Sequence, residues 1–221
     1  MAGLEDPSAQ LTPLLERSAL EVAPRLLGAL VTHESAAGRV TVRLTEVEAY
    51  DGANDPGSHA YRGQTSRNAV MFGPAGLLYV YFTYGMHWCA NVVCGPLGTA
   101  SAVLLRAGEV VDGVEVARAR RPAARTDRDL ARGPARLTQA LGIDGSHDGA
   151  SLTGAALQLR PRARSLPRRT ISSGPRVGVS GAGGDATRYP WRFWVMGDPT
   201  VSVYRPSVPR SRRRAERVGG A

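Results

Sequence analysis

The sequence predicts an α+β fold, namely a single domain with a curved, mostly antiparallel sheet, packed helices and a protruding β-hairpin. Hairpin patterns dominate the chain, and strand-like segments do not alternate regularly with helix-like ones as they do in doubly wound folds. The chain has 221 residues with 43% hydrophobic content, which is enough to bury a full core. We expect a disordered N-terminus over 1–13, a folded domain over 14–205, and a basic, disordered tail over 206–221.

The first expected elements are a helix and a hairpin. Ser18–Glu21 match the capping-box pattern and predict a helix that runs through about Ala29. A strand over 30–33, a turn over 36–38 and a strand over 39–50 then form the first hairpin.

A second hairpin is expected over 77–93, with Gly85 at its turn. The polar loop that precedes it, 51–70, is of a length that is usually functional or disordered. Tyr84 and Met86 flank the glycine, where polar residues are usual. Either the tip folds back onto the core, or it is an apolar wedge for a base stack, because such side chains insert into DNA and unstack it.

The second half of the chain is expected to add strands and two helices. A strand over 102–109 carries Arg106 in an otherwise apolar run. The helices cover 112–120 and 134–141, and Gly142 ends the second one. Short strands are expected over 176–179, 192–196 and 201–204, after a basic, proline-rich loop over 160–175.

The charge of the chain indicates a polyanionic partner, with nucleic acid as the first candidate. The net charge is +9, and all 28 basic residues are arginines, whose planar groups pair with phosphates bidentately. A genome rich in GC explains the choice of arginine over lysine better than it explains the excess of cations. Without lysine there is no ordinary Schiff-base nucleophile, so any base excision would use water or, at most, the N-terminal amine.

Several other classes of protein are not expected. The sequence contains no run of 18 apolar residues, so no membrane helix is expected. Residues 1–10 also lack the pattern of a secretion signal. We therefore expect a cytoplasmic protein, nucleoid-associated if bacterial. Cys89 and Cys94 are expected to be reduced, buried thiols. Four scattered histidines and two close cysteines do not predict a metal site, and no cofactor is implied.

Two carboxylates in the first hairpin are the strongest functional signal. Apolar residues alternate with polar ones over 40–44, which is the period of a half-buried strand. If that period continues, Glu46, Glu48 and Tyr50 share the apolar face. Burying a charge costs several kcal/mol unless it is paired, so these acids predict either a structural ion pair or a catalytic pocket.

The surrounding residues favour chemistry on a nucleic-acid base. Such chemistry needs the nucleotide to be flipped out of the duplex and stacked between aromatic rings. An inward carboxylate then suits hydrolysis of a glycosidic bond, whose transition state resembles an oxocarbenium ion.

Six sequence blocks in order resemble the alkyladenine DNA glycosylase family, the mammalian type of 3-methyladenine DNA glycosylase. The blocks are TEVEAYDG, SHAYRGQTSRN, MFGPAGLLYVYFTYGMHWCANVV, AVLLRAGE, GPARLTQALGI and RVGV. The resemblance covers roughly residues 12–204. It implies a monofunctional glycosylase that removes alkylated or deaminated purines from double-stranded DNA by base flipping, acts as a monomer, and leaves an abasic site for base excision repair.

The resemblance also implies the catalytic residues. Glu48 matches the general base that activates the attacking water, and Arg106 matches the arginine that helps to hold this water. The backbone carbonyl of Val177 matches another group that holds the water. Because Glu48 aligns with the base, we interpret Glu46 as structural.

The base-binding residues follow in the same way. Tyr50 matches the ring on one face of the flipped base, and His59 and Tyr81 match the pair on its other face. Asn91 matches the pocket-floor asparagine that disfavours guanine by crowding its exocyclic amine.

Two residues at the hairpin tip match the DNA-intercalating positions. Tyr84 matches the residue that enters the gap in the duplex, and Met86 matches its neighbour. The chain departs from the mammalian members at His87, where they have tyrosine. Two rivals are a lesion-binding DNA module without activity and a general nucleic-acid coating protein.

Overall fold

The computed structural model of the chain describes residues 7–83 and 85–207. One antiparallel sheet of eight strands has the order β3-β4-β5-β2-β1-β6, with β8 pairing to β2 and β7 to β8. The strands are β1 (Leu30–Ser35), β2 (Gly38–Asp51), β3 (Leu78–Thr83), β4 (His87–Cys94), β5 (Ser101–Asp112), β6 (Leu157–Arg160), β7 (Ile171–Gly174) and β8 (Arg192–Val195). The helices are α1 (Pro7–Leu15), α2 (Ala19–Leu26), α3 (Val114–Arg120) and α4 (Pro134–Leu141). The predicted α+β class with both hairpins is confirmed.

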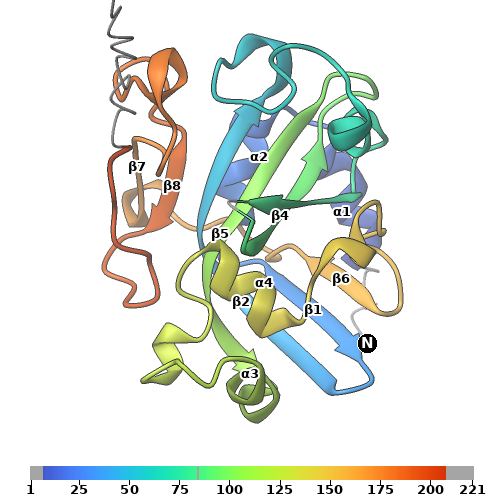
Figure 1. Ribbon diagram of the computed structural model, residues 1–221, viewed down its shortest axis with the longest axis vertical. Coiled ribbons are helices and arrows are strands. Elements are labelled where there is room, and N and C mark those ends of the chain that lie inside the picture. Colours follow the sequence, from blue (N-terminus) through green and yellow to red (C-terminus); the bar gives the residue numbers. More distant parts are fainter. Residues whose placement is uncertain (1–6, 84, 208–221) are drawn as a thin grey trace, which may run out of the picture.

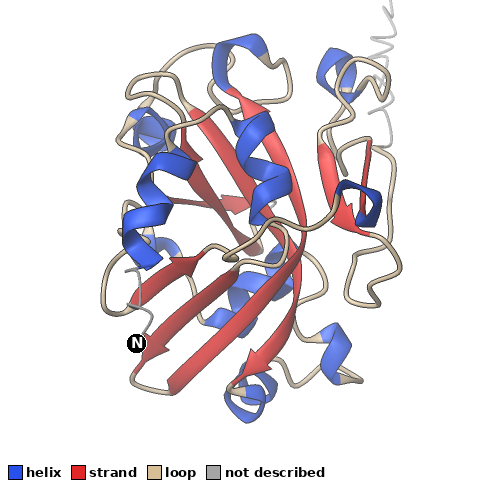
Figure 2. Cartoon of the chain, turned by 180° about the vertical axis from the view of Figure 1, so that it is seen from behind, coloured by secondary structure: helices blue, strands red, loops and turns tan. Residues whose placement is uncertain are grey.

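The two long strands β2 and β5 form the centre of the molecule, and helices cover both of their faces. Two opposite views show α1 and α2 against one face and α4 against the other (Figures 1 and 2). Val22 and Leu26 of α2 are fully buried in the same hydrophobic cluster as Val47 and Ala49 of β2. No helix within residues 7–83 and 85–207 is long and apolar enough to cross a membrane.

The N-terminal part of the chain differs from the prediction. Residues 7–13, expected to be disordered, belong to α1, because Leu11 and Leu15 lie one turn apart and both are buried in the core. The amide of Gly95 also donates to the Leu15 carbonyl at 2.7 Å. Residues 1–6, and 208–221 of the expected tail, lie outside the described residues.

Helix α2 starts where the sequence predicts but ends earlier. The chain turns extended at Leu27 and left-handed at Gly28, so the helix stops at Leu26 and not at Ala29. Ser18 precedes the first turn as expected, but its hydroxyl donates to the Glu21 carboxylate at 3.1 Å and not to the helix backbone. The position of this cap was therefore predicted correctly, whereas its hydrogen bonds were not.

A pair of β-bulges sets the two faces of β2. Thr45 on β2 and Arg106 on β5 are the extra residues where the pairing shifts from Leu44–Gly108 to Val47–Leu105. Leu44 and Val47 consequently lie on the same, core-facing side. The prediction that Glu46, Glu48 and Tyr50 share the apolar face of 40–44 is therefore wrong, since the bulge turns them to the opposite face.

Two expected strands are absent from the described part of the chain. Residues 176–179 and 201–204 do not form strands, because backbone amides there are bound by buried side chains. Val177 N–H donates to Glu48 at 2.7 Å, and Ser202 N–H donates to Glu46 at 2.7 Å. The expected strand over 192–196 is confirmed as β8, which pairs with β2 and with β7. Strand β7 lies in the segment that was expected to be a loop.

The turn before α3 gives a testable prediction for stability. Gly113 has a φ of +72°, and a Cβ there would lie 1.9 Å from the Arg39 carbonyl oxygen. Gly98 has a φ of +85° with nothing within 4 Å of such an atom. We expect Gly98→Ala to lower the free energy of unfolding by about 1–2 kcal/mol, from backbone strain alone. Gly113→Ala should cost about 1–3 kcal/mol more, because the clash must also be relieved. Urea unfolding curves check this, and equal losses would contradict it.

Candidate active site

A cavity of about 580 Å³ opens between the β3–β4 hairpin, the loop after β2, the start of α4 and residues 177–180. Six of the residues predicted from the sequence line it: Tyr50, His59, Tyr81, Asn91, Arg106 and Val177. Met71, Tyr79, Cys89 and Leu104 complete its inner wall. The sequence therefore predicted residues that come together from β2, β3, β4, β5 and two loops.

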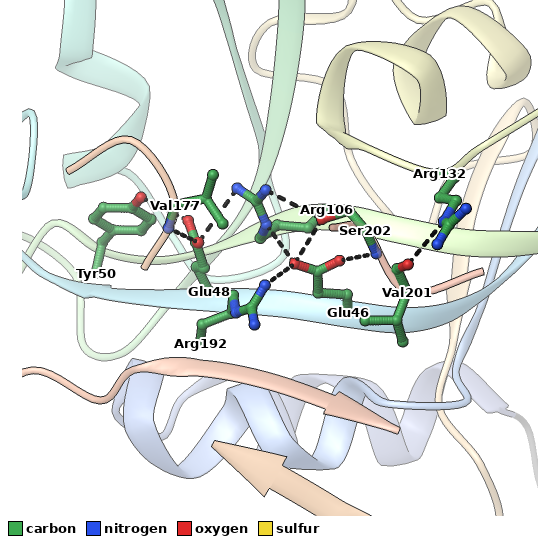
Figure 3. A network of polar contacts seen from close by, with 9 residues as sticks. All are labelled: Glu46, Glu48, Tyr50, Arg106, Arg132, Val177, Arg192, Val201 and Ser202. Carbon is green, nitrogen blue, oxygen red and sulfur yellow. Dashed lines mark hydrogen bonds and ion pairs between the residues drawn. The ribbon is translucent and has the colours of Figure 1, made fainter. Parts of the chain in front are cut away.

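Glu48 lies behind this wall and has no exposed surface. Its Oε1 accepts the Val177 N–H at 2.7 Å and lies 3.3 Å from Nη1 of Arg106. Its Oε2 accepts the Tyr50 hydroxyl at 2.9 Å. Figure 3 shows these groups around the carboxylate, on the side of β2 away from α2. Glu48 is therefore connected to the cavity through three residues that line it.

Arg106 links Glu48 to the second buried acid, Glu46. Its Nε donates to Glu46 Oε1 at 2.8 Å, while Arg192 reaches the same oxygen at 3.2 Å. Burial alone would lower the pKa of Arg106, but the Glu48 and Glu46 carboxylates outweigh it and raise this pKa above its usual value. Arg106 therefore remains a cation between two acids.

An aromatic group forms one side of the cavity. The rings of His59 and Tyr81 meet edge to face with centroids 4.5 Å apart, and Tyr79 stacks on Tyr81 at 5.6 Å. The Tyr79 hydroxyl and His59 Nδ1 are 3.2 Å apart. Burial, and then the charge of Arg67, lower the pKa of His59, so this imidazole is neutral at pH 7.

Tyr50 also lines the cavity, and Arg176 packs against its ring. The Arg176 guanidinium lies 4.5 Å from the centre of the Tyr50 ring and does not line the cavity. Arg176 in turn forms a fully buried ion pair with Asp55, with Nη2 to Oδ1 at 2.7 Å. Burial and the Glu48 charge raise the pKa of Tyr50 well above its usual value, so its hydroxyl stays protonated and donates to Glu48. The sequence contained no signal for the Asp55–Arg176 pair.

Asn91 is a buried residue that lines the cavity. It pairs with Tyr79 across β3 and with Leu104 across β5, and its side-chain amide donates to the Tyr79 carbonyl at 3.2 Å. Since this bond uses Nδ2, the Oδ1 atom is left for other partners. Cys89 and Cys94 are buried and free, and burial raises the pKa of each thiol.

The hairpin tip is described only in part. Tyr84 lies outside the described residues. Met86 is 66% exposed, so its side chain does not fold back onto the core. Phe82 on the same hairpin is 43% exposed. An apolar surface is thus available beside the cavity, as the wedge interpretation requires.

Comparison with known proteins identifies the family. A family model described as methylpurine-DNA glycosylase matches residues 13–199, a range that contains every predicted site residue. The chain belongs to the methylpurine-DNA glycosylase family. Among residues 7–83 and 85–207, the chain has no group of three or more histidine, cysteine or acidic side chains that could hold a metal ion.

Relatives from several bacteria share most of the chain, and each is named "Putative 3-methyladenine DNA glycosylase". The protein of Streptomyces avermitilis is 56% identical over 200 residues, which cover 89% of this chain and 92% of the relative. That of Leifsonia xyli subsp. xyli is 57% identical over 195 residues, covering 85% and 89%. That of Burkholderia lata is 52% identical over 188 residues, covering 85% and 87%. The family resemblance seen in the sequence is thereby confirmed.

Proposed function

We propose that this methylpurine-DNA glycosylase hydrolyses the N-glycosidic bond of alkylated or deaminated purines in double-stranded DNA, leaving an abasic site for base excision repair. The observation that carries the proposal is the buried Glu48 carboxylate, bonded to Tyr50, Arg106 and Val177 at the wall of an aromatic cavity. A carboxylate in this position suits attack of water on a sugar carbon.

Glu48 serves as the base in the proposed reaction. The Arg106 contact, at 3.3 Å, is the longest of its three contacts and is the one that opens to admit the nucleophilic water. The water oxygen bonds to C1′ of the sugar, and its proton passes to Glu48. The bond from C1′ to the purine nitrogen breaks, and its electron pair leaves with the base.

The charge of the lesion decides whether an acid is needed. A purine alkylated at N3 or N7 is cationic, so it departs as a neutral base and needs no proton. A neutral lesion such as hypoxanthine departs with a negative charge and needs a proton or strong hydrogen bonds at its nitrogens. We therefore expect cationic methylpurines to be removed fastest.

The proposed pocket holds the flipped base between Tyr50 and the His59–Tyr81 pair, with Asn91 at the floor. A cationic purine stacks favourably on electron-rich rings, and a neutral His59 adds no opposing charge. We propose that Tyr84 enters the gap in the duplex with Met86 beside it, while arginines contact the phosphates. The protein would act as a monomer on chromosomal DNA, in the cytoplasm and associated with the nucleoid.

An excision assay tests the proposal. The purified protein is incubated with duplexes that each carry a methylated purine, hypoxanthine, ethenoadenine or no lesion, and heating in alkali reveals abasic sites. We expect abasic product from methylated purines and none from undamaged duplex. Lesion-selective binding without any abasic product would contradict the proposal and favour a lesion-binding module. Binding that ignores the lesion would favour a coating protein.

A further inference from the structure

Glu46 is a buried acid that the proposed mechanism does not use. Its side chain has no exposed surface and accepts four contacts, which come from Arg106, Arg192 and two atoms of Ser202. We propose that Glu46 is a positioning residue for the glycosylase reaction: it anchors Arg106 and balances its charge so that Glu48 can act as the base. This inference rests on the proposed function.

The geometry of Arg106 is the first argument. A guanidinium group is planar and rigid, so a contact at Nε fixes the direction of both Nη atoms. Glu46 holds Nε at 2.8 Å, whereas Glu48 lies 3.3 Å from Nη1. Arg106 is therefore anchored on the Glu46 side and loosely held on the Glu48 side. A water can enter at Glu48 without releasing the arginine.

The charge of the cluster is the second argument. Glu46 and Glu48 face two buried arginines, Arg106 and Arg192, so these four groups are neutral together when both acids are ionised. Arg176 also acts on Glu48, but Asp55 balances its charge, and the Tyr50 hydroxyl stays protonated. Without the charge on Glu46, both arginine charges would be balanced by Glu48 alone. The surplus positive charge would stabilise the ionised Glu48 carboxylate and make it a weaker acceptor for the proton of water.

The C-terminal segment is the third argument, because it closes this network from outside. Ser202 donates to Glu46 through its amide at 2.7 Å and its hydroxyl at 3.0 Å. The Val201 carbonyl accepts from Arg132 at 2.9 Å, and the hydroxyls of Thr200 and Thr45 are 2.8 Å apart (Figure 3 shows the Ser202 and Val201 contacts). These bonds hold Glu46 in one orientation toward Arg106.

The test is the pH dependence of single-turnover excision by Glu46→Gln on a methylpurine duplex. Excision needs Glu48 in its ionised form, so the excision rate rises with pH on the acid side of the pH–rate profile, which we call the acid limb. Loss of the Glu46 charge favours ionised Glu48, so this limb should move to lower pH. The rate at the plateau of the profile should fall by about 10- to 100-fold, the size expected when a charge-assisted hydrogen bond to Arg106 is lost.

Two further variants separate positioning from general stability. Leu26→Ala leaves a cavity at a fully buried position of α2, on the other face of β2, and destabilises the fold without touching the acids. It should leave the acid limb in place. Glu46→Asp keeps the charge but shortens the reach, so it should lower the plateau and leave the limb in place. If Glu46→Gln does not fold, the milder Glu46→Asp decides the question, because its plateau should fall while that of Leu26→Ala, which removes no polar contact, should match the wild type.

The outcomes distinguish this inference from the proposed function. If the wild type produces abasic sites and Glu46→Gln keeps the limb and plateau of the wild type, Glu46 has no positioning role. A lower plateau with an unmoved limb in Glu46→Gln would also overturn the inference, because that variant removes the charge of Glu46. Absence of excision by the wild type would instead overturn the proposed function.

Discussion

Glu48→Gln is expected to lower the single-turnover rate of purine excision by about 10²- to 10⁴-fold, the range usual for loss of a general base. Glutamine has nearly the same shape but cannot take a proton from water. Its carbonyl can still accept the Val177 N–H, which lies 2.7 Å from Oε1. The fold around the cavity should therefore persist. Alkali cleavage of a methylpurine duplex measures the rate.

Binding of the lesion provides the control for this prediction. Tyr50, His59, Tyr81 and Asn91 are unchanged in the variant, so its affinity for a lesion duplex should stay close to that of the wild type. Glu34→Gln, at an exposed acid paired with Arg39, should excise at the wild-type rate. If Glu48→Gln excises within about tenfold of the wild type, the base has been assigned to the wrong residue.

Asp55→Asn is expected to lower the free energy of unfolding by about 3–5 kcal/mol, because it leaves the buried Arg176 charge unpaired. Both side chains of this pair have no exposed surface, and Arg176 lies against the Tyr50 ring. Besides Asp55, Arg176 bonds only to the carbonyls of Ala49 and Gly183 among the described residues. Two carbonyls cannot balance a full charge away from water. Urea unfolding measures the loss.

The matched control for this stability prediction is again Glu34→Gln. That substitution breaks an ion pair of similar length, 2.7 Å, whose side chains are about half exposed to solvent. Water and salt already screen such a pair, so the unfolding midpoint should hardly move. Similar losses in the two variants would show that burial does not amplify the Asp55–Arg176 pair.

Local pattern predicted the elements whose own residues specify them. Gly85 at the turn identified the second hairpin, and Pro134 with Gly142 bounded α4. The family resemblance, and not the predicted face of β2, led to the interpretation of Glu48 as the base. Strand period alone could not show the bulges at Thr45 and Arg106, because they depend on pairing between strands about sixty residues apart.

Long-range contacts explain what the sequence did not predict. Asp55 and Arg176 are 121 residues apart, and Glu46 and Ser202 are 156 residues apart. In both cases the local sequence is ordinary, a polar loop or a short strand-like run. The chain folds these segments differently because a buried carboxylate takes up their backbone or side-chain donors.

The bulged strand β2 also limits how this gene can change over evolutionary time. On either side of Thr45 the strand presents alternate residues to the core and to the opposite face, so a substitution alters one face and leaves the other intact. Deleting one codon of the regular strand beyond the bulge, such as that of Val47, would instead exchange the faces of the residues that follow and place Glu48 among hydrocarbon side chains. We therefore expect related genes to vary in this strand by replacement and never by single-codon insertion or loss.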